Sequence, residues 1–351
     1  MKTIGVSLWD GQVRGGGNHR TVMRPAVRPR AGLRELFLEA YPKFAAACRA
    51  VEEPGIAIVA VDESTARPAG LVKLLARVQR PTAAIVGRHD RCDLFLAGSD
   101  RLALRQLAVV VAPVDSWERG ATVRYRVLDL KTQDGMIDEE GRVLRGLRAE
   151  GPALLRCGGY ALFMLNLGDP TDWPQSPSDA WAMLPERVYF DELERCPDGS
   201  MPRLRQIPDR IEMRGTRGTR DFETHQSVVM RTVGPRDTGS RLVGGGDAAG
   251  TLEIIGPHRR TVLAVGHDAL NDGLLLGRYS RCDAVDPDDA SLSRVHALLL
   301  HDRDRLLMID TASFNGTRIS GEENARVIAI DRDLEIVLGR KTRARWRWTA
   351  S

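Results

Sequence analysis

Gly277-Arg278 ends one apolar run of the chain, Ser293-Arg294-Val295-His296 precedes the next, and Ser313-Phe314-Asn315-Gly316-Thr317 follows a third. Each apolar run is short enough to be a β-strand, and strand-like runs continue from Thr251 to the end of the chain. The three polar clusters are therefore expected to be loops between strands.

The composition argues against a membrane protein and against a disulfide-rich one. The chain has 351 residues, of which 42% are hydrophobic, and no apolar run approaches the length of a membrane span. The apolar stretch within residues 1–10 is too short for a signal peptide, so a cytoplasmic location is expected. The net charge of +4 is too small to imply nucleic acid.

The cysteines indicate a reducing compartment. They show no CxxC spacing, which argues against a disulfide framework and against a zinc site. The five cysteines are Cys48, Cys92, Cys157, Cys196 and Cys282.

The N-terminal part divides in two. Residues 1–30 are rich in Gly, Pro and Arg and predict a flexible basic tail. Residues 31–52 carry apolar side chains at helical spacing, which predicts an amphipathic helix that Pro42 kinks or splits. We expect this helix to pack on the domain that follows rather than to bind a partner.

The remaining chain reads as strands, linker and strands. Residues 53–168 contain short β segments broken by Gly, Asp and Pro, which predict a sandwich. Residues 169–248 are rich in Pro, Gly, Arg, Asp and Thr and predict a partly disordered linker. Within this linker, Ser178 to Glu194 predicts a short helix capped by Ser178 or Asp179. Residues 249–351 return to strands.

The two strand-rich regions resemble each other. Gly87 to Asp93 and Gly277 to Asp283 both read GRxxRCD. Leu104-Arg105-Gln106-Leu107-Ala108 then aligns with Ser293-Arg294-Val295-His296-Ala297, and Asp134-Gly135 aligns with Asn315-Gly316. The first copy carries an insertion, mainly around Pro113 to Ala121. We interpret the two regions as two copies of one fold.

The three clusters resemble the ligand-binding loops of the forkhead-associated (FHA) domain, a β-sandwich that binds phosphothreonine on loops at one end. The resemblance covers Thr251 to Thr349 well and Ile56 to Leu167 weakly. It implies an all-β fold with two FHA-like β-sandwich domains, joined by a long linker and preceded by a helix. It also points to a binding protein more than to an enzyme.

The resemblance assigns phosphopeptide-binding residues. Arg278 would grip the phosphate with its planar guanidinium, and Ser293 would donate its hydroxyl to the same group. Arg294 would either add positive charge beside the phosphate or face solvent. Asn315 would bond the peptide backbone through its amide.

Other residues would support the loops. Gly277 would end a strand where a side chain has no room, and His296 would support the binding loops from beneath. Ser313 and Thr317 would hold the same loop in place, and Gly316 would allow its turn. Taken alone, Arg278 could be an exposed arginine at a strand end, Ser293 a turn serine, and Asn315-Gly316 a plain hairpin turn.

The first copy departs from this pattern. On the alignment above, Leu104 stands where Ser293 does, Leu107 where His296 does, and Asp134 where Asn315 does. A leucine cannot donate to phosphate and a carboxylate would repel it. We expect the first copy to be a structural or protein-docking domain.

Two other signals have simpler interpretations. The acidic cluster Asp286, Asp288 and Asp289 is expected to be a solvated loop rather than a metal site. Arg343 to Trp348 alternates arginine with apolar side chains, which favours a last strand over a nucleic-acid site.

The function predicted is a phosphothreonine-dependent adaptor in Ser/Thr kinase signalling, with no catalytic residues, metal or cofactor. The alternative is a structural or assembly protein that uses FHA-like sandwiches for phosphate-independent contacts. The predicted partners are a phosphothreonine protein or peptide and an upstream Ser/Thr kinase, without nucleic acid or membrane. A homo-oligomer through the first domain or a phosphorylated linker is also considered, using the threonines Thr21, Thr216, Thr219, Thr224, Thr232 and Thr238.

Overall fold

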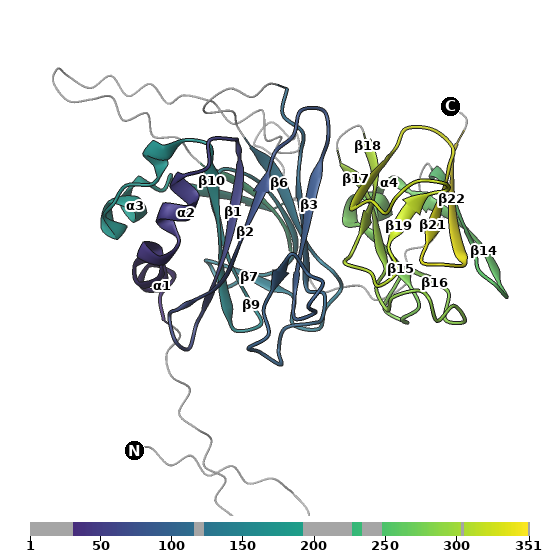
Figure 1. Cartoon of the computed structure of the whole chain (residues 1–351), viewed down its shortest axis with the longest axis horizontal. Helices are drawn as coiled ribbons and strands as arrows, with labels where there is room; N and C mark the ends of the chain where they lie inside the picture. The colour runs from purple at the N-terminus through teal and green to yellow at the C-terminus, as the bar shows by residue number, and fades with distance from the viewer. Residues whose placement is uncertain (1–30, 116–122, 192–226, 234–247, 303–304, 350–351) are drawn as a thin grey trace, which may run out of the picture. The chain divides into compact units, whose positions relative to one another are not determined.

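The computed structural model describes residues 31–115, 123–191, 227–233, 248–302 and 305–349. The chain is mostly β, with two sandwiches and helices before the first strand, which confirms the predicted fold class (Figure 1). The predicted basic tail, residues 1–30, lies outside the described ranges, as does Cys196.

The N-terminal helical segment is divided at the proline. Helix α1 (Leu33–Ala40) and helix α2 (Ala45–Arg49) are separated by a 3-10 turn, η1 (Tyr41–Lys43), which contains Pro42. Pro42 has no N–H to continue an α-helix, which explains the interruption. The ring of Phe37 lies 5.5 Å from that of Phe163 in the first sandwich, so the segment packs on the domain that follows it.

The first sandwich has its strands in the order β2-β1-β10-β9-β7-β8-β6-β5-β3-β4. The bounds are β1 (Gly55–Asp62), β2 (Pro68–Leu75), β3 (Thr82–Gly87), β4 (Leu94–Phe95), β5 (Leu107–Val111), β6 (Arg124–Asp129), β7 (Met136–Asp138), β8 (Val143–Glu150), β9 (Ala153–Cys157) and β10 (Tyr160–Leu167).

Part of the segment predicted as linker is built into this sandwich. It contains η2 (Pro170–Asp172), α3 (Pro177–Met183), β11 (Arg187–Asp191) and β12 (Ser227–Val233). Strand β12 pairs antiparallel with β8 and parallel with β11. The prediction of a helix over Ser178 to Glu194 was wrong at both ends, because Ser176 is the N-cap and Leu184 leaves the helical conformation.

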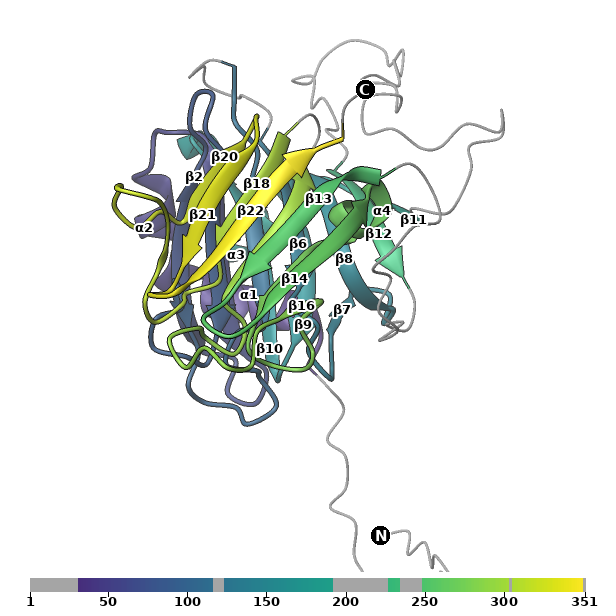
Figure 2. The same ribbon diagram turned by 90° about the vertical axis from the view of Figure 1, so that its right-hand side faces the viewer.

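The second sandwich consists of two sheets, ordered β14-β13-β22-β21-β19 and β16-β15-β17-β18-β20. The first of these is seen in Figure 2. The bounds are β13 (Ala248–Ile255), β14 (Arg260–Gly266), α4 (His267–Asp272), β15 (Leu274–Gly277), β16 (Ala284–Val285), β17 (Ala297–Asp302), β18 (Arg305–Asp310), β19 (Thr317–Ile319), β20 (Val327–Ile330), β21 (Leu334–Leu338) and β22 (Thr342–Trp348). In β22, Ala344 and Trp346 are buried while Arg343 and Arg347 are exposed, as expected for a last strand.

The two sandwiches pack through one sheet face each. Strands β3 and β5 of the first sandwich and β15, β17 and β18 of the second carry apolar residues on both faces. Alternate residues, such as Val109 and Leu299, point into their own sandwich core. Their neighbours Val110, Leu298 and Leu300 lie in a separate cluster shared by the two sandwiches. Burial on both faces explains why these strands are continuous apolar runs.

This interface is tested by removing buried volume from it. Replacing Leu298, which is 2% exposed, with Ala should lower the free energy of unfolding by about 2–5 kcal/mol, because a cavity remains between the sandwiches. Val262→Ala is the control, since Val262 is 58% exposed and should change stability by no more than about 0.5 kcal/mol. Urea unfolding of the whole chain measures both. Equal stability of the two variants would contradict the packing.

Candidate functional site

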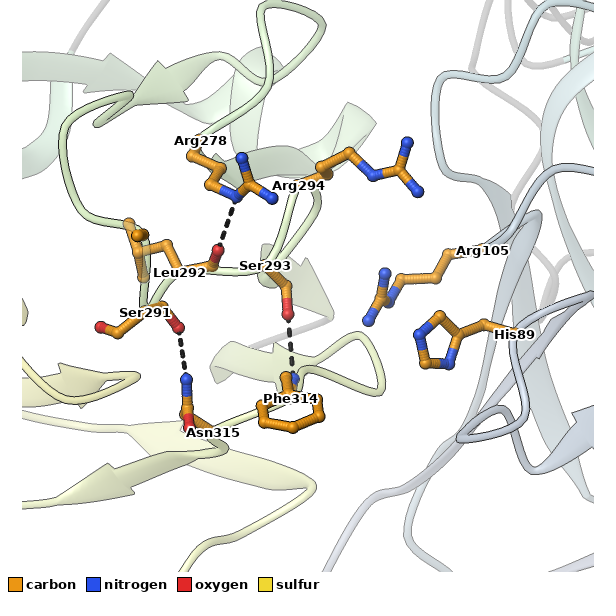
Figure 3. Close-up of a pocket in the computed structure, with 10 residues that line it drawn as sticks. His89, Arg105, Arg278, Ser291, Leu292, Ser293, Arg294, Phe314 and Asn315 are labelled. Carbon is orange, nitrogen blue, oxygen red and sulfur yellow. Dashed lines mark hydrogen bonds between the residues drawn. The ribbon is translucent and has the colours of Figure 1, made fainter.

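The three polar clusters form three loops that meet at one end of the second sandwich (Figure 3). Arg278 follows β15, Ser293 and Arg294 precede β17, and Asn315 lies between β18 and β19. All four line one cavity of about 290 Å³. The structure thus brings together the four residues predicted to contact a ligand.

Arg278 is exposed and held at its base. Its Nε donates to the carbonyl of Leu292 at 3.0 Å, which leaves the outer nitrogens of the guanidinium directed away from that bond. A Cβ on Gly277 would lie 2.4 Å from the carbonyl oxygen of Arg294. Only glycine therefore permits this close approach of the two loops.

His296 lies beneath the loops, with no exposed surface. Its Nδ1 accepts from the backbone N–H of Ser293 at 3.0 Å, so Nε2 carries the proton and donates to the carbonyl of Gly316 at 3.1 Å. One imidazole thus joins the Ser293 loop to the Asn315 loop. Burial lowers the pKa of His296, which keeps the ring neutral.

Ser293 contacts the neighbouring loop through its side chain. Its Oγ accepts from the backbone N–H of Phe314 at 2.9 Å. A hydroxyl can accept and donate at once, and in the described part of the chain no group accepts the Ser293 hydroxyl hydrogen. That hydrogen is available to a ligand in the cavity.

Asp310 organises the loop between β18 and β19, and sequence reasoning missed this role. The residue is 6% exposed, and its carboxylate accepts several hydrogen bonds. It accepts from the N–H and the hydroxyl of Ser313 at 2.8 and 2.6 Å and from the hydroxyl of Thr317 at 2.7 Å. Asp129 accepts equivalent bonds from Thr132 in the first sandwich. The match of Asp134-Gly135 with Asn315-Gly316 also aligns Asp129 with Asp310, and this repeated aspartate was the sequence signal that could have identified the role.

The side chain of Asn315 crosses to the Ser291 loop. Its Nδ2 donates to the carbonyl of Ser291 at 2.7 Å, and its Oδ1 accepts from Arg340 Nε at 3.3 Å. Gly316 has φ of +80°, where a Cβ would also collide with the side chain of Asn324. A turn of this shape therefore requires glycine at 316.

The prediction of a solvated acidic loop was wrong for Asp286 and Asp289, which are each 2% exposed. The hydroxyl oxygen of Thr342 in β22 lies 3.1 Å from Asp286 Oδ2 and 2.8 Å from Asp289 Oδ2. Burial alone would raise the pKa of Asp289, but hydrogen bonds from Ser291 and Thr342 outweigh it and lower the pKa. These carboxylates support the Ser291 loop from within.

The alignment of the first sandwich with the Ser293 cluster was wrong by one residue. The N–H of Ala103 donates to Gln106 Oε1 at 2.9 Å and Gln106 Nε2 donates to the carbonyl of Gly135 at 3.1 Å. These are the bonds that His296 makes in the second sandwich, so Gln106 stands where His296 does. Ala103 rather than Leu104 is then the counterpart of Ser293. Apolar residues on both sides made the shift invisible in the sequence.

The same one-residue shift changes the counterpart of Arg105 in the second sandwich. Arg105 corresponds to Val295, which lies in the cluster between the sandwiches. Arg105 and His89 of the first sandwich therefore reach the cavity of the second and line it (Figure 3). Sequence reasoning missed both residues, since no local pattern marks a contact between two domains.

The described ranges hold neither a metal site nor a membrane-spanning helix. No group of three His, Cys, Asp or Glu side chains in them could hold a metal ion. Of the helices that the structure describes, none is long and apolar enough to cross a membrane.

Residues 274–339 match the model of the FHA domain, and this range contains all three polar clusters. The chain is similar to the FHA-1 domain of Rv1747 from Mycobacterium tuberculosis, with 22% identity, a TM-score of 0.24 and coverage of 29% of this chain and 100% of that one. The Slr1951 protein from Synechocystis sp. has 23% identity and a TM-score of 0.26, with coverage of 30% of this chain and 100% of that one. The FHA domain of CT664 from Chlamydia trachomatis has 22% identity and a TM-score of 0.24, with coverage of 29% of this chain and 98% of that one. No curated protein matches the chain.

Acid sensitivity tests the buried neutral imidazole. Because the pKa of folded His296 lies below its unfolded value, the unfolded chain takes up a proton first as the pH falls. The stabilising contribution is complete above the unfolded pKa of about 6.5 and is lost below it. His296→Gln should therefore lose less stability than the unmodified chain between about pH 7.5 and about pH 5.

Urea unfolding at the two pH values measures this difference. Gln106 shows that an amide can make both bonds of the imidazole. The control is His258→Gln, because His258 is exposed and its replacement should leave the acid sensitivity unchanged. An equal loss of stability in His296→Gln and the unmodified chain would refute a buried neutral ring.

Proposed function

We propose that the second sandwich binds a phosphothreonine segment of a partner protein, and that the chain is an adaptor downstream of a Ser/Thr kinase. The observation that carries the proposal is the convergence of Arg278, Ser293, Arg294 and Asn315 on one cavity. The cavity lies within the residues that match the FHA domain.

The arginines supply the charge that a phosphate needs. Arg278 is fixed by its Nε bond to Leu292 and presents the rest of its guanidinium to a ligand. Arg294 is exposed, and its guanidinium has no hydrogen bond or ion pair with the described residues. A phosphate dianion gains charge-assisted hydrogen bonds from such donors.

Ser293 and Asn315 supply orientation rather than charge. The Ser293 hydroxyl hydrogen points to the phosphate in this proposal, because its oxygen already accepts from Phe314. Asn315 stays bonded to Ser291 and uses its remaining amide hydrogen and lone pair for the backbone of the bound peptide. No step requires a cofactor, a metal or a catalytic residue.

The phosphorylated threonine has two candidate sources. It belongs either to another protein or to a second copy of this chain, which would make a phosphorylation-dependent oligomer. Of the threonines considered for the second case, Thr232 lies in β12. The other five, Thr21, Thr216, Thr219, Thr224 and Thr238, lie outside the described residues. The cytoplasmic location and the kinase remain predictions.

The alternative function, assembly through phosphate-independent contacts, has one observation in its favour. The first sandwich already uses the outer face of β3, β5 and β6 to pack on the second without any phosphate. This face is occupied within the chain, so assembly with another protein would need a different surface. For that reason we favour the phosphothreonine proposal.

Charge removal at the site tests the proposal. Arg278→Gln should weaken binding of a degenerate phosphothreonine peptide pool by about tenfold to a hundredfold, because one charge-assisted contact to phosphate is lost. Isothermal titration of the whole chain measures the affinity, and circular dichroism monitors the fold.

Arg88→Gln is a matched control for the same change in charge. Arg88 follows β3 as Arg278 follows β15, and its Nε donates to the carbonyl of Leu102 at 2.7 Å. It does not line the cavity, so affinity should stay unchanged. Full phosphopeptide affinity in Arg278→Gln would remove the proposed mechanism. Phosphate-independent capture by that variant would favour assembly.

A further inference from the structure

The cavity has a second wall that the first sandwich provides. Eight of its lining residues come from the second sandwich, and the other two are His89 and Arg105. Figure 3 shows Arg105 extending from the first sandwich toward Ser293 and Phe314. The first sandwich, which lacks counterparts of Ser293 and Asn315, thus still contributes side chains to the site of the second.

Arg105 reaches the cavity because of its register in the first sandwich. It occupies the position of Val295, whose side chain faces the other sandwich rather than its own core. Its Nε donates to the carbonyl of Thr311 at 2.5 Å and its Nη2 to the carbonyl of Ala312 at 2.6 Å. These carbonyls precede the loop that carries Phe314 and Asn315.

Arg105 is a buried charge that forms no ion pair with the described residues. The residue is 5% exposed, and its hydrogen-bond acceptors are neutral carbonyls. In the described part of the chain, no carboxylate lies within ion-pair distance of it. Burial is the largest cause of the lowered pKa of Arg105; Cys92 and Asp310 oppose the shift, and the charges of Arg294 and Arg281 add to it. An anion in the cavity would compensate this charge.

His89 adds a titratable group to the same wall. Its side chain is 27% exposed, and its Nδ1 lies 2.8 Å from Asp90 Oδ1. Burial lowers the pKa of His89, and the charge of Arg105 lowers it further while Asp90 opposes the shift. An arriving anion would favour the charged form of His89, in which both ring nitrogens donate.

The lining has more positive charge than one phosphate needs. It contains the three arginines Arg105, Arg278 and Arg294 and no carboxylate. A phosphothreonine carries a charge of about −1.5 to −2 at neutral pH. Once it is bound by Arg278 and Arg294, the charge of Arg105 remains uncompensated.

We propose that Arg105 and His89 form the second half of a composite site, and that the ligand carries a second negative group close to the phosphothreonine. This inference rests on the proposed function. The second group is an acidic side chain or another phosphate, since both offer oxygens to a guanidinium. The first sandwich thereby acts as a specificity determinant for the second.

Peptide pools with matched charge test this inference on the whole chain. One pool has a central phosphothreonine and uncharged flanks. A second set carries one glutamate at each flanking position in turn, and a third carries a second phosphothreonine there. We expect at least one doubly anionic pool to bind on the order of tenfold more tightly than the uncharged pool.

Substitution of the first sandwich should remove this preference. Arg105→Gln should bring the ratio of affinities for the doubly anionic and uncharged pools close to one, and His89→Gln should lower it in part. If Arg105 only held the loop in place, both pools would weaken equally and the ratio would survive, which would overturn the inference.

Arg91→Gln is the control from the same wall. Arg91 also holds the loop, since its Nη1 donates to the Phe314 carbonyl at 3.0 Å and its guanidinium lies 4.3 Å from the ring centroid. It does not line the cavity, so the ratio should stay at the unmodified value. Equal binding of all phosphothreonine pools by the unmodified chain would overturn this inference and leave the proposed function standing. Failure of every pool to bind would overturn both.

Discussion

The imidazole of His296 joins the two loops on which the site depends. Through Ser293 and Gly316 it fixes the distance between a hydroxyl donor and an amide that belong to different strand connections. The ring is fully buried, so both bonds are made away from water, where an unpaired group would be costly. Asp310 continues the network by holding Ser313 and Thr317. Arg278 and Arg294 line the cavity beside this network, and both residues are exposed to a ligand.

A second constraint is the packing of the two sandwiches face to face. Residues with the same position in each sandwich, such as Ile85 and Leu275, meet in one apolar cluster. Because Arg105 sits at one of these positions, its guanidinium enters the partner sandwich at the base of the Asn315 loop. The first sandwich lacks counterparts of Ser293 and Asn315, yet it still contributes side chains to the cavity of the second. Its Arg105 serves the interface between the sandwiches and not the loops of the first sandwich.

Much of this site could be predicted from the sequence because the relevant spacings are local. Arg278, Ser293 and Asn315 each adjoin a strand end, and the strands themselves are short apolar runs. Contacts over longer separations could not be predicted. Asp286 and Asp289 are buried against Thr342, which belongs to a strand far away in the sequence. A run of acidic residues, read locally, predicts an exposed loop instead. The one-residue shift that aligns Gln106 with His296 could not be seen in the sequence, because Leu104 and Leu107 are both apolar and fit either alignment of the two copies. The interface that places Arg105 is a property of two sheet faces, which no single segment reveals.

One titration decides whether this cavity binds phosphothreonine. The whole chain is titrated with a single phosphothreonine peptide pool before and after treatment with a phosphatase. We expect saturable binding that disappears with the phosphate. Equal binding of both samples, or no binding of the phosphorylated one, would contradict it.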